Sequence, residues 1–294
     1  MRLDHRGLQA LDAVIKTQSF AAAAQQLFIT QPAISQRIKQ LEVIMGQPLL
    51  IRSHPYRATP LGEKMLGLLR RIHLLEEHFL QEIEQDLPAR LSVALNRDSL
   101  ETWFTHLLAD LRFLERVNLD IITDDQELTL DYFRKGAVSA CVSSHDKALP
   151  GCECILLGHM DYLLVASPAF IERYFENDAA LEDNLYYAPL LVFDSRDRLH
   201  ERFFTHFFKK ALMPKRYNMV PSVQGFREFA IQGYGFGLIP SLDITRELAA
   251  GILKEICPGK RWLMPLYWHY WQLPAQHYQE FIETIIQGAS RYLI

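Results

Sequence analysis

The pattern of apolar and polar positions near the N-terminus predicts two short helices separated by a break. Small residues at 21–24 suit a helix that a second helix can cross closely, and the break falls at residues 28–30. In the second helix, apolar residues recur at intervals of four, three and four residues, which places them on one face. These residues are Ile34, Ile38, Leu41 and Met45. The arrangement is typical of a helix-turn-helix.

The second of these helices has a start signal and a polar face. Thr30 can cap its first turn, and Pro32 fits there because the N–H that proline lacks would have no partner in that turn. The polar face carries Gln36 and Lys39, which suit the DNA major groove because their side chains can pair with base edges and phosphates. The same residues also suit the solvated face of a core helix, so this helix alone does not decide between the two roles.

A further helix and a wing are expected around this pair. Residues 3–17 carry apolar side chains at helical spacing and predict a helix that covers the other two. Residues 48–59 predict a short extended arm, a tight turn around Pro55 and a return. Arg52 and Arg57 lie on the two sides of that turn, where they could reach phosphates or the minor groove. The alternative is that one or both are only solvated.

A heptad pattern follows the wing. Apolar residues step alternately by four and three, with charged residues beside them, and predict a helix from Thr59 to about Asp86. The apolar positions are Leu61, Met65, Leu68, Ile72, Leu75 and Phe79. We expect this helix to pair with a second copy of the chain as a coiled coil, with packing on its own domain as the alternative. A dimer would place two reading helices on successive faces of the major groove.

Beyond Pro88, extended apolar runs alternate with helical stretches, which predicts parallel sheets with crossover helices. The first set comprises strands at 91–95, 119–122 and 138–142 and helices at 99–116 and 127–135. The second set comprises strands at 190–193, 217–220 and 236–239 and helices at 199–209 and 225–232. Residues 161–167 and 266–271 would cross between the two lobes, and 276–292 would form a closing helix. The chain is thus expected to be α/β, with domains at 1–58, 59–87 and 88–294.

Polar residues recur at the carboxyl ends of the predicted strands, where open α/β sheets bind ligands. Ser99 would also open a helix, whose N-terminus suits a carboxylate ligand. The acids nearby could hold a cation, and their alternative roles are capping and solvation. The candidates are Asp98, Ser99, Asp124, Asp125, Ser143 and Asp194.

Charge divides the chain into a basic head and an acidic body. Residues 1–60 hold seven Lys and Arg against three Asp and Glu, a charge of +4, which leaves −8 for the rest of a chain whose net charge is −4. Such a head suits DNA binding. The 294 residues contain no apolar run that could span a bilayer, and the N-terminus lacks the apolar core of a secretory signal, so we expect a cytoplasmic protein without membrane contact.

The sequence offers little support for catalysis or a bound metal. The Cys-Glu-Cys triplet at 152–154, near His145 and His159, matches no common zinc spacing, so free thiols are expected. Residues 144–146 are Ser, His and Asp, but neighbours along a chain cannot fold onto one another as a catalytic triad. The glycines at 233–237 have the wrong spacing for a dinucleotide-binding motif. We therefore expect neither an enzyme nor a resident cofactor.

Ordered motifs in the head resemble the LysR-type transcriptional regulators. The matching stretches are 22–27, 30–35, 38–42, 46–50, Arg52 and 59–62. Further matches at 8–15, 35–42, 148–150, 161–162, 193–194 and 266–269 are similar to the lysine- and arginine-responsive ArgP/LysG branch of that family. The resemblance implies a winged helix-turn-helix head, a linker helix and a two-lobed effector domain like that of periplasmic binding proteins.

The resemblance also implies partners. It implies a homodimer or tetramer that binds an imperfect palindrome in double-stranded DNA, with RNA polymerase as a candidate partner. It further implies lysine or arginine as co-effector and control of genes for amino-acid export or metabolism. The alternative function is a nucleoid or replication-origin binder whose DNA binding does not depend on a ligand.

Individual residues carry over from the same resemblance. DNA contacts are implied for Thr30, Gln31, Pro32, Ser35, Gln36, Lys39 and Arg52, and Ser99, Ser143 and Asp194 match effector-contacting positions. One departure concerns residues 222–224, where a Ser-Ser-Glu-like stretch is expected but the chain has Ser-Val-Gln. If Gln224 contacts the effector, a basic ligand would lose a charged partner there.

Overall fold

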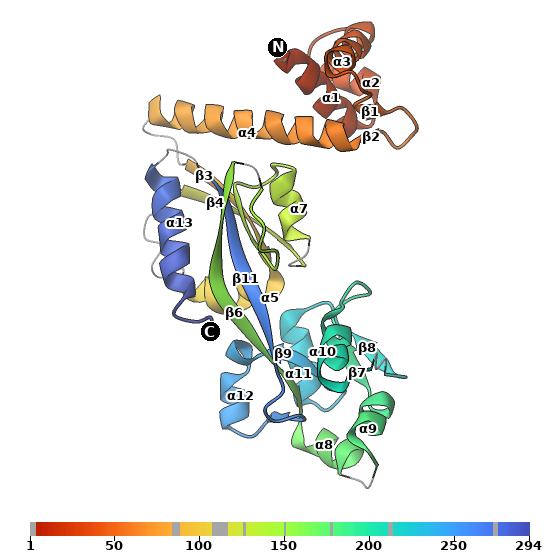
Figure 1. The fold of residues 1–294 in the computed structure, drawn as a ribbon, viewed down its shortest axis with the longest axis vertical. Helices are drawn as coiled ribbons and strands as arrows, with labels where there is room; N and C mark the ends of the chain where they lie inside the picture. Colours follow the sequence, from red (N-terminus) through yellow and green to blue (C-terminus); the bar gives the residue numbers. More distant parts are fainter. Residues whose placement is uncertain are drawn as a thin grey trace.

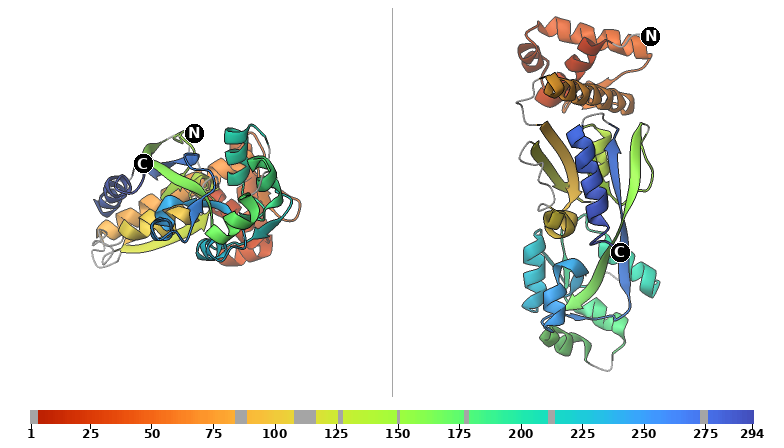
Figure 2. Two further views of the ribbon diagram at one scale, coloured as in Figure 1. Left: turned by 90° about the horizontal axis from the view of Figure 1, so that it is seen from below. Right: turned by 90° about the vertical axis from the view of Figure 1, so that its left-hand side faces the viewer.

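The computed structural model describes residues 4–83, 89–107, 117–125, 128–149, 151–176, 179–210, 214–272 and 276–294. Three parts follow one another along an elongated molecule: a helical head, the long helix α4 (Pro60–Ile83) and a body of two lobes (Figure 1). The right-hand view of Figure 2 shows the same three tiers from the side, and the C-terminus lies in the middle of the molecule, close to the second lobe. None of the helices in the described part of the chain is long and apolar enough to cross a membrane.

Three helices and a small hairpin form the head. They are α1 (His5–Thr17), α2 (Phe20–Gln26), α3 (Gln31–Met45), β1 (Leu50–Ile51) and β2 (Arg57–Ala58). Ile34, Ile38 and Leu41 of α3 are buried in one cluster with apolar residues of α1 and α2, as their spacing predicts. Gly46 follows α3 with φ +67°, a left-handed conformation that glycine adopts without a steric penalty. The predicted helix-turn-helix and wing are therefore confirmed.

Helix α4 has two kinds of apolar surface. Its first half packs on the head, where Met65 is only 6% exposed and Leu61 lies against the same core. In its second half, Leu75 and Phe79 are 48% and 61% exposed. The expectation that one seam pairs throughout with a second chain does not hold for Met65, because that part of the seam completes the core of the head. The predicted linker residues 84–87 lie outside the described residues.

The first lobe is built on parallel strands. β3 (Ala89–Asn96) lies between β4 (Val117–Asp124) and β5 (Ala140–Ser143), and it is parallel to both. Helices α7 (Thr129–Arg134) and α13 (Gln276–Ala289) lie on either side of the sheet (Figure 1). The helix predicted at 99–116 begins as three short segments, and its residues 108–116 lie outside the described part. The segments are α5 (Arg97–Ser99), the π-helical turn η1 (Leu100–Phe104) and α6 (Thr105–Leu107).

Two long strands join the lobes. β6 (Cys152–Ala166) and β11 (Arg261–Trp271) run antiparallel along their length and pass from the first lobe into the second (Figure 1). Only their parts at 161–167 and 266–271 are predicted from the sequence. Because β11 also pairs antiparallel with β5, the sheet is mixed rather than purely parallel as expected. The two strands thus connect the first lobe to the second.

The second lobe contains a smaller sheet surrounded by helices. Parallel strands β7 (Leu190–Val192) and β8 (Tyr217–Met219) lie beside β9 (Gly237–Pro240), which pairs with β6. Helices α10 (Leu199–Phe208) and α11 (Val223–Ile231) agree with the predicted ranges to within two residues. The sequence analysis did not predict α8 (Pro168–Phe175), α9 (Leu181–Tyr187), the 3-10 turn η3 (Ser241–Asp243), α12 (Thr245–Ala249) or β10 (Lys254–Glu255).

Candidate functional site

The polar face of α3 is turned outward. Gln36 and Lys39 are exposed, whereas the apolar residues of the same helix are buried against α1 and α2. The Oγ1 atom of Thr30 accepts a hydrogen bond from the backbone N–H of Ala33, so Thr30 caps the helix as predicted. Gln31 and Pro32 in the first turn are exposed, and Ser35 is half-buried. The six predicted contact residues of this helix therefore share its N-terminal half and its accessible side.

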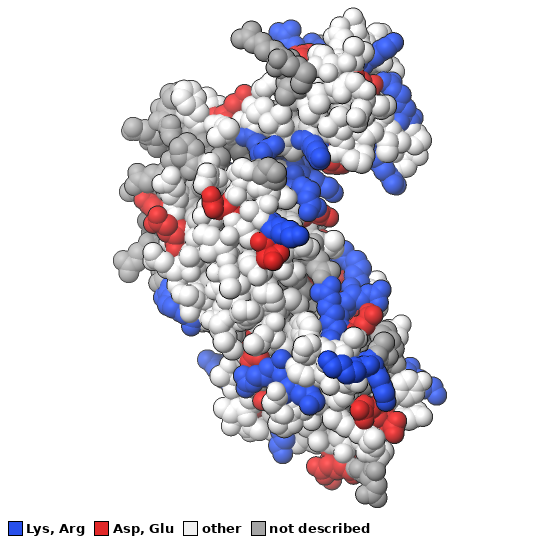
Figure 3. All heavy atoms as spheres, viewed as in Figure 1, with Lys and Arg blue, Asp and Glu red and all other residues white. Residues whose placement is uncertain are grey.

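A glutamate of α3 joins this helix to the wing. Oε1 of Glu42, near the end of α3, accepts hydrogen bonds from the backbone N–H groups of Leu49 (2.9 Å) and Leu50 (3.3 Å). Its other oxygen lies 3.3 Å from Nη2 of Arg52. Arg57 is exposed on β2. Figure 3 shows Lys and Arg side chains on the head and in the notch beneath α4. The Glu42 pair means that Arg52 already has an anionic partner, which sequence reasoning missed.

An open cavity lies between the lobes. The first lobe contributes the carboxyl ends of β3 and β4, and the second lobe contributes the loop after β7 and residues near β9. Among the described residues, the polar and charged side chains that line it are Asn96, Arg97, Asp98, Asp124, Asp125, Tyr162, Asp194, Asp197, His200 and Asp243. Phe193, Leu199, Val223, Phe226, Leu238, Ile239 and Pro240 supply its apolar wall.

A half-buried carboxylate lies in the wall of the cavity. Oδ2 of Asp98 accepts a hydrogen bond from the hydroxyl of Tyr162 in β6. Burial raises the pKa of Asp98 to about 6, even though the hydrogen bond from Tyr162 opposes that shift. Beside it, Oδ1 of Asn96 is buried without a hydrogen-bond partner in the described part of the chain. A buried acceptor of this kind is costly unless a ligand or water donates to it.

The loop after β7 is held by a second carboxylate. Asp197 accepts hydrogen bonds from the backbone N–H groups of Phe193 (3.1 Å) and Leu199 (2.9 Å). Its Oδ2 lies 3.8 Å from Nδ1 of His200, whose Nε2 accepts a hydrogen bond from the N–H of Leu238. Burial lowers the pKa of His200, which keeps its imidazole neutral at pH 7. His200 therefore supports the cavity wall without adding positive charge.

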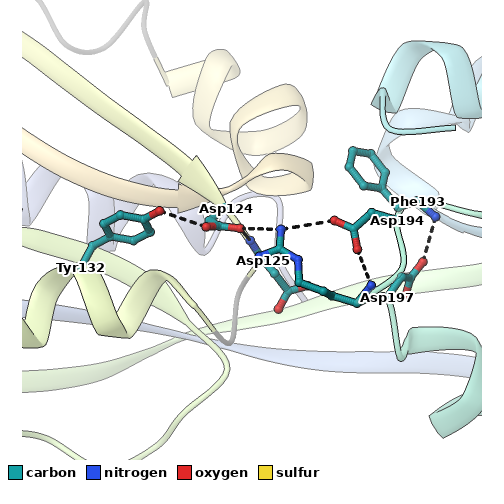
Figure 4. A network of polar contacts seen from close by, with 7 residues as sticks. Asp124, Asp125, Tyr132, Phe193, Asp194 and Asp197 are labelled. Carbon is teal, nitrogen blue, oxygen red and sulfur yellow. Dashed lines mark hydrogen bonds and ion pairs between the residues drawn. The ribbon is translucent and has the colours of Figure 1, made fainter. Parts of the chain in front are cut away.

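A third group of polar contacts spans the two lobes (Figure 4). Nη2 of Arg196 lies 3.3 Å from Oδ1 of Asp124 and 3.4 Å from Oδ2 of Asp194. The hydroxyl of Tyr132 in α7 donates to Oδ2 of Asp124 over 3.0 Å. Burial alone would raise the pKa of Asp194, but hydrogen bonds and charge from Arg196 lower it below its usual value. Asp194 is therefore ionised at pH 7.

The structure brings together only part of the predicted effector set. Asp98, Asp124 and Asp194 line the cavity. Ser99 and Ser143 are fully buried outside it, and the hydroxyl of Ser143 accepts a hydrogen bond from the N–H of His145. Gln224 is exposed and lines an adjoining depression that shares Arg97, Phe193 and Val223 with the cavity. The amide at position 224 therefore lies beside the cavity and is not part of its lining.

Several cavity residues were not predicted. Asp197 and His200 follow a strand end by a few residues, so the rule that ligands bind at the carboxyl ends of strands could have included them. Tyr162 lies within β6 and Asp243 lies in η3, where no local pattern marks a ligand site. Tyr162 and Asp243 line the cavity because the second lobe packs onto the crossing strands, and the sequence does not show that packing.

The candidate metal ligands of the sequence do not assemble. In the described part of the chain, no three His, Cys, Asp or Glu side chains are placed to hold a metal ion. The four cysteines are free. Sγ of Cys154 lies 3.6 Å from Nε2 of His269, and burial raises the pKa of the Cys154 thiol. This thiol is therefore protonated at pH 7 and is a poor metal ligand in that state.

Both parts of the chain match known families of domains. Residues 5–63 match the bacterial regulatory helix-turn-helix protein, lysR family, and residues 84–289 match the LysR substrate binding domain. The HTH-type transcriptional regulator ArgP of Vibrio parahaemolyticus is 40% identical over 294 residues, which covers 99% of this chain and 98% of that protein.

Solved structures show the same arrangement of domains. ArgP from Mycobacterium tuberculosis is 34% identical, with a TM-score of 0.87 and 99% of both chains covered. Full-length LysG from Corynebacterium glutamicum, with the effector Arg bound, is 29% identical, with a TM-score of 0.83 and 99% of both chains covered. The head, the long helix and the two lobes thus all have counterparts in these regulators.

Proposed function

Because the chain belongs to the LysR family of transcriptional regulators and is of the ArgP/LysG type, we propose that it senses a basic amino acid, lysine or arginine, in the cavity between its lobes. The protein is a DNA-binding regulator and not an enzyme. Its head would bind an imperfect palindrome through α3 and the wing, as a homodimer or tetramer. Genes of amino-acid export or metabolism are the proposed targets.

The charge of the cavity is the observation that carries this proposal. The described residues that line it include six aspartates, and Arg97 is the only Lys or Arg among them. Asp243 is neutralised by Arg227, whose Nη1 lies 2.7 Å from its Oδ1, but the excess of negative charge remains. A cationic side chain would be attracted to such a site, because ionised carboxylates accept strong hydrogen bonds from ammonium and guanidinium groups. Bound Arg in the related LysG supports the same ligand class.

Ligand binding would act on DNA by shifting populations. A ligand that contacts both lobes stabilises the arrangement in which those contacts are made, and it changes DNA affinity only if that arrangement places the heads differently. The proposal therefore requires a measurable coupling between the cavity and the head.

Thermal melting of the purified protein tests the ligand class. Lysine or arginine at about 100 times its dissociation constant should stabilise the native state by about 2.7 kcal/mol, which raises Tm by several degrees. Citrulline and norleucine are their neutral analogues and should produce smaller shifts at equal concentration. Asp98→Asn should reduce the shift with arginine, because it removes a carboxylate from the cavity. Asp183→Asn, an exposed position in α9, is the matched control and should not.

The same ligands should alter the affinity of the protein for promoter DNA in a mobility-shift or anisotropy titration. If neither lysine nor arginine changes Tm or DNA affinity, sensing of basic amino acids is refuted. DNA binding would then be independent of such a ligand, as in a nucleoid or replication-origin binder.

A further inference from the structure

Arg196 supplies a positive charge of the protein's own at the junction of the lobes. It belongs to the loop after β7 in the second lobe, whereas Asp124 ends β4 in the first lobe. Its Nη2 atom lies within 3.4 Å of one oxygen of Asp124 and one of Asp194 (Figure 4). A single guanidinium therefore bridges the two lobes beside the ligand cavity.

The protein itself engages both oxygens of each of these carboxylates. Oδ1 of Asp124 also accepts the N–H of Asp125 (2.9 Å), and Oδ2 accepts the hydroxyl of Tyr132. Oδ1 of Asp194 accepts the backbone N–H of Arg196 itself (2.7 Å). These contacts fix the rim of the cavity, so a ligand's cationic group would find fewer free acceptor positions here than beside Asp98.

We propose that Arg196 is a clasp between the lobes and a specificity-determining residue of the effector site. As a clasp, it holds Asp124 of the first lobe to the second lobe when no ligand is bound. As a cation beside the cavity, it offsets part of the aspartate charge and reduces the preference of the site for basic over neutral amino acids. The first role is independent of the proposed function, and the second role rests on it.

The expected effects are modest because the clasp is accessible to water. The Arg196 side chain is 55% exposed, and exposed ion pairs in proteins correspond to changes of about two- to fivefold in an equilibrium constant. Added salt screens such pairs, so both effects should shrink between low and high ionic strength. The variant Arg196→Ala removes the guanidinium from an exposed loop and leaves the cores of both lobes intact.

Arg198→Ala is the matched control. Arg198 lies two residues further along the same loop, its side chain is 62% exposed, and its Nη1 lies 2.9 Å from Oε2 of Glu201 within the second lobe. Both variants remove one positive charge from the same loop, but in the described part of the chain only Arg196 of the two pairs with a residue of the first lobe. Differences between the two variants therefore report on the contact between lobes.

Hydrogen exchange of the ligand-free full-length protein tests the clasp. Arg196→Ala should increase exchange about two- to fivefold in peptides containing Asp124 and Asp125, because Asp124 loses its contact with the second lobe and the N–H of Asp125 is bonded to Asp124. Arg198→Ala should leave these peptides unchanged. Equal exchange of Asp124 and Asp125 in wild type and Arg196→Ala would overturn the clasp.

Calorimetric titration with arginine and with citrulline tests the specificity role. Loss of the clasp affects both ligands alike, so the ratio of their dissociation constants isolates the charge effect. The ratio for citrulline over arginine should rise about two- to fivefold in Arg196→Ala and stay constant in Arg198→Ala. An unchanged ratio would overturn the specificity role. Failure of wild type to bind either ligand would overturn the proposed function and this role together, while the exchange result would still decide the clasp.

Discussion

Gln36 and Lys39 share the exposed face of α3, and Arg57 stands apart from them on the wing. An amide at the centre of a reading helix can pair with base edges in a geometry that depends on the base. An arginine on a wing adds a charge that phosphates attract whatever the sequence. Contacts of these two kinds respond differently to the choice of DNA and to salt.

Substitution of Gln36 by alanine should weaken binding to the specific site by about 1–3 kcal/mol and hardly affect random DNA. Arg57→Ala should weaken both DNAs alike and lower the salt slope of log K by about one. The effect of Arg52→Ala should be smaller than that of Arg57→Ala, because Glu42 already neutralises part of the Arg52 charge. Anisotropy titrations at several salt concentrations measure all three. Equal losses on both DNAs for Gln36→Ala would exclude a role in base reading.

The sequence predicts those cavity residues that lie at or just after the end of a strand. Asp98, Asp124 and Asp194 follow strand ends, and strand ends of each lobe face the cavity. Ser143 also ends a strand, but it is fully buried and its hydroxyl is bonded to His145. The sequence does not predict the role of Arg196, because that role depends on a contact with Asp124, which lies 72 residues earlier in the chain. Burial and contacts across lobes are tertiary properties that a local pattern does not contain.

At the scale of elements, α4 combines two surfaces that its heptad pattern does not distinguish. Met65, Leu66 and Leu69 are buried in the head, while Leu75 and Phe79 are exposed in the single chain. An exposed apolar stripe on a long helix is best explained by another helix that covers it. The heptad pattern therefore predicts the helix correctly, but it does not show that the first half packs on the head while only the second half is left exposed for the proposed second chain.

The double substitution Leu75→Glu with Phe79→Glu should convert the dimer to monomers, because it places charges in the proposed seam. The conservative pair Leu75→Ile with Phe79→Leu keeps the surface apolar and should preserve the dimer. Sedimentation velocity distinguishes the two states, and circular dichroism checks that the head remains folded. A mass unaffected by the two glutamates would refute pairing through this half of α4.

Elements were predicted best where apolar spacing is regular. Helices α1 and α3 and the wing follow their patterns closely, whereas the crossing strands β6 and β11 are much longer than the stretches predicted for them. His159 interrupts the apolar run of β6, and Pro265 in β11 argues against the interior of a strand. These two residues pair with each other across the two strands, and that pairing depends on tertiary structure.

At the scale of the molecule, α7 lies between the cavity and the head. Tyr132 on α7 donates to Asp124 at the cavity. At the end of α7, the backbone oxygen of Lys135 accepts a hydrogen bond from Arg70 of α4. Arg70 also approaches Asp12 of α1, with 3.9 Å between Nη2 and Oδ1. A Cβ atom on Gly67 would lie 3.0 Å from the backbone oxygen of Arg134, so this glycine lets α4 and α7 approach closely.

Removal of the contacts that Arg70 makes should uncouple effector binding in the cavity from DNA binding by the head. Arg70→Ala deletes the only side chain in the described residues that contacts both Lys135 and Asp12, yet it touches neither the cavity nor the face of α3. Affinity for the effector alone should therefore stay nearly constant, while the ratio of DNA affinities with and without effector should fall to within about twofold of one. Couplings in regulated proteins are typically about 5- to 150-fold, so the loss is measurable.

Linkage supplies an internal check on that result, because DNA must change effector affinity by the same factor as effector changes DNA affinity. In Arg70→Ala, both factors should fall together. Arg134→Ala is the matched control, since this exposed arginine at the end of α7 pairs with Asp131 of its own helix. It should keep the wild-type coupling. Full coupling in Arg70→Ala would show that the signal between cavity and DNA takes another route, such as the contact between Arg71 and the ring of Trp271 (4.8 Å).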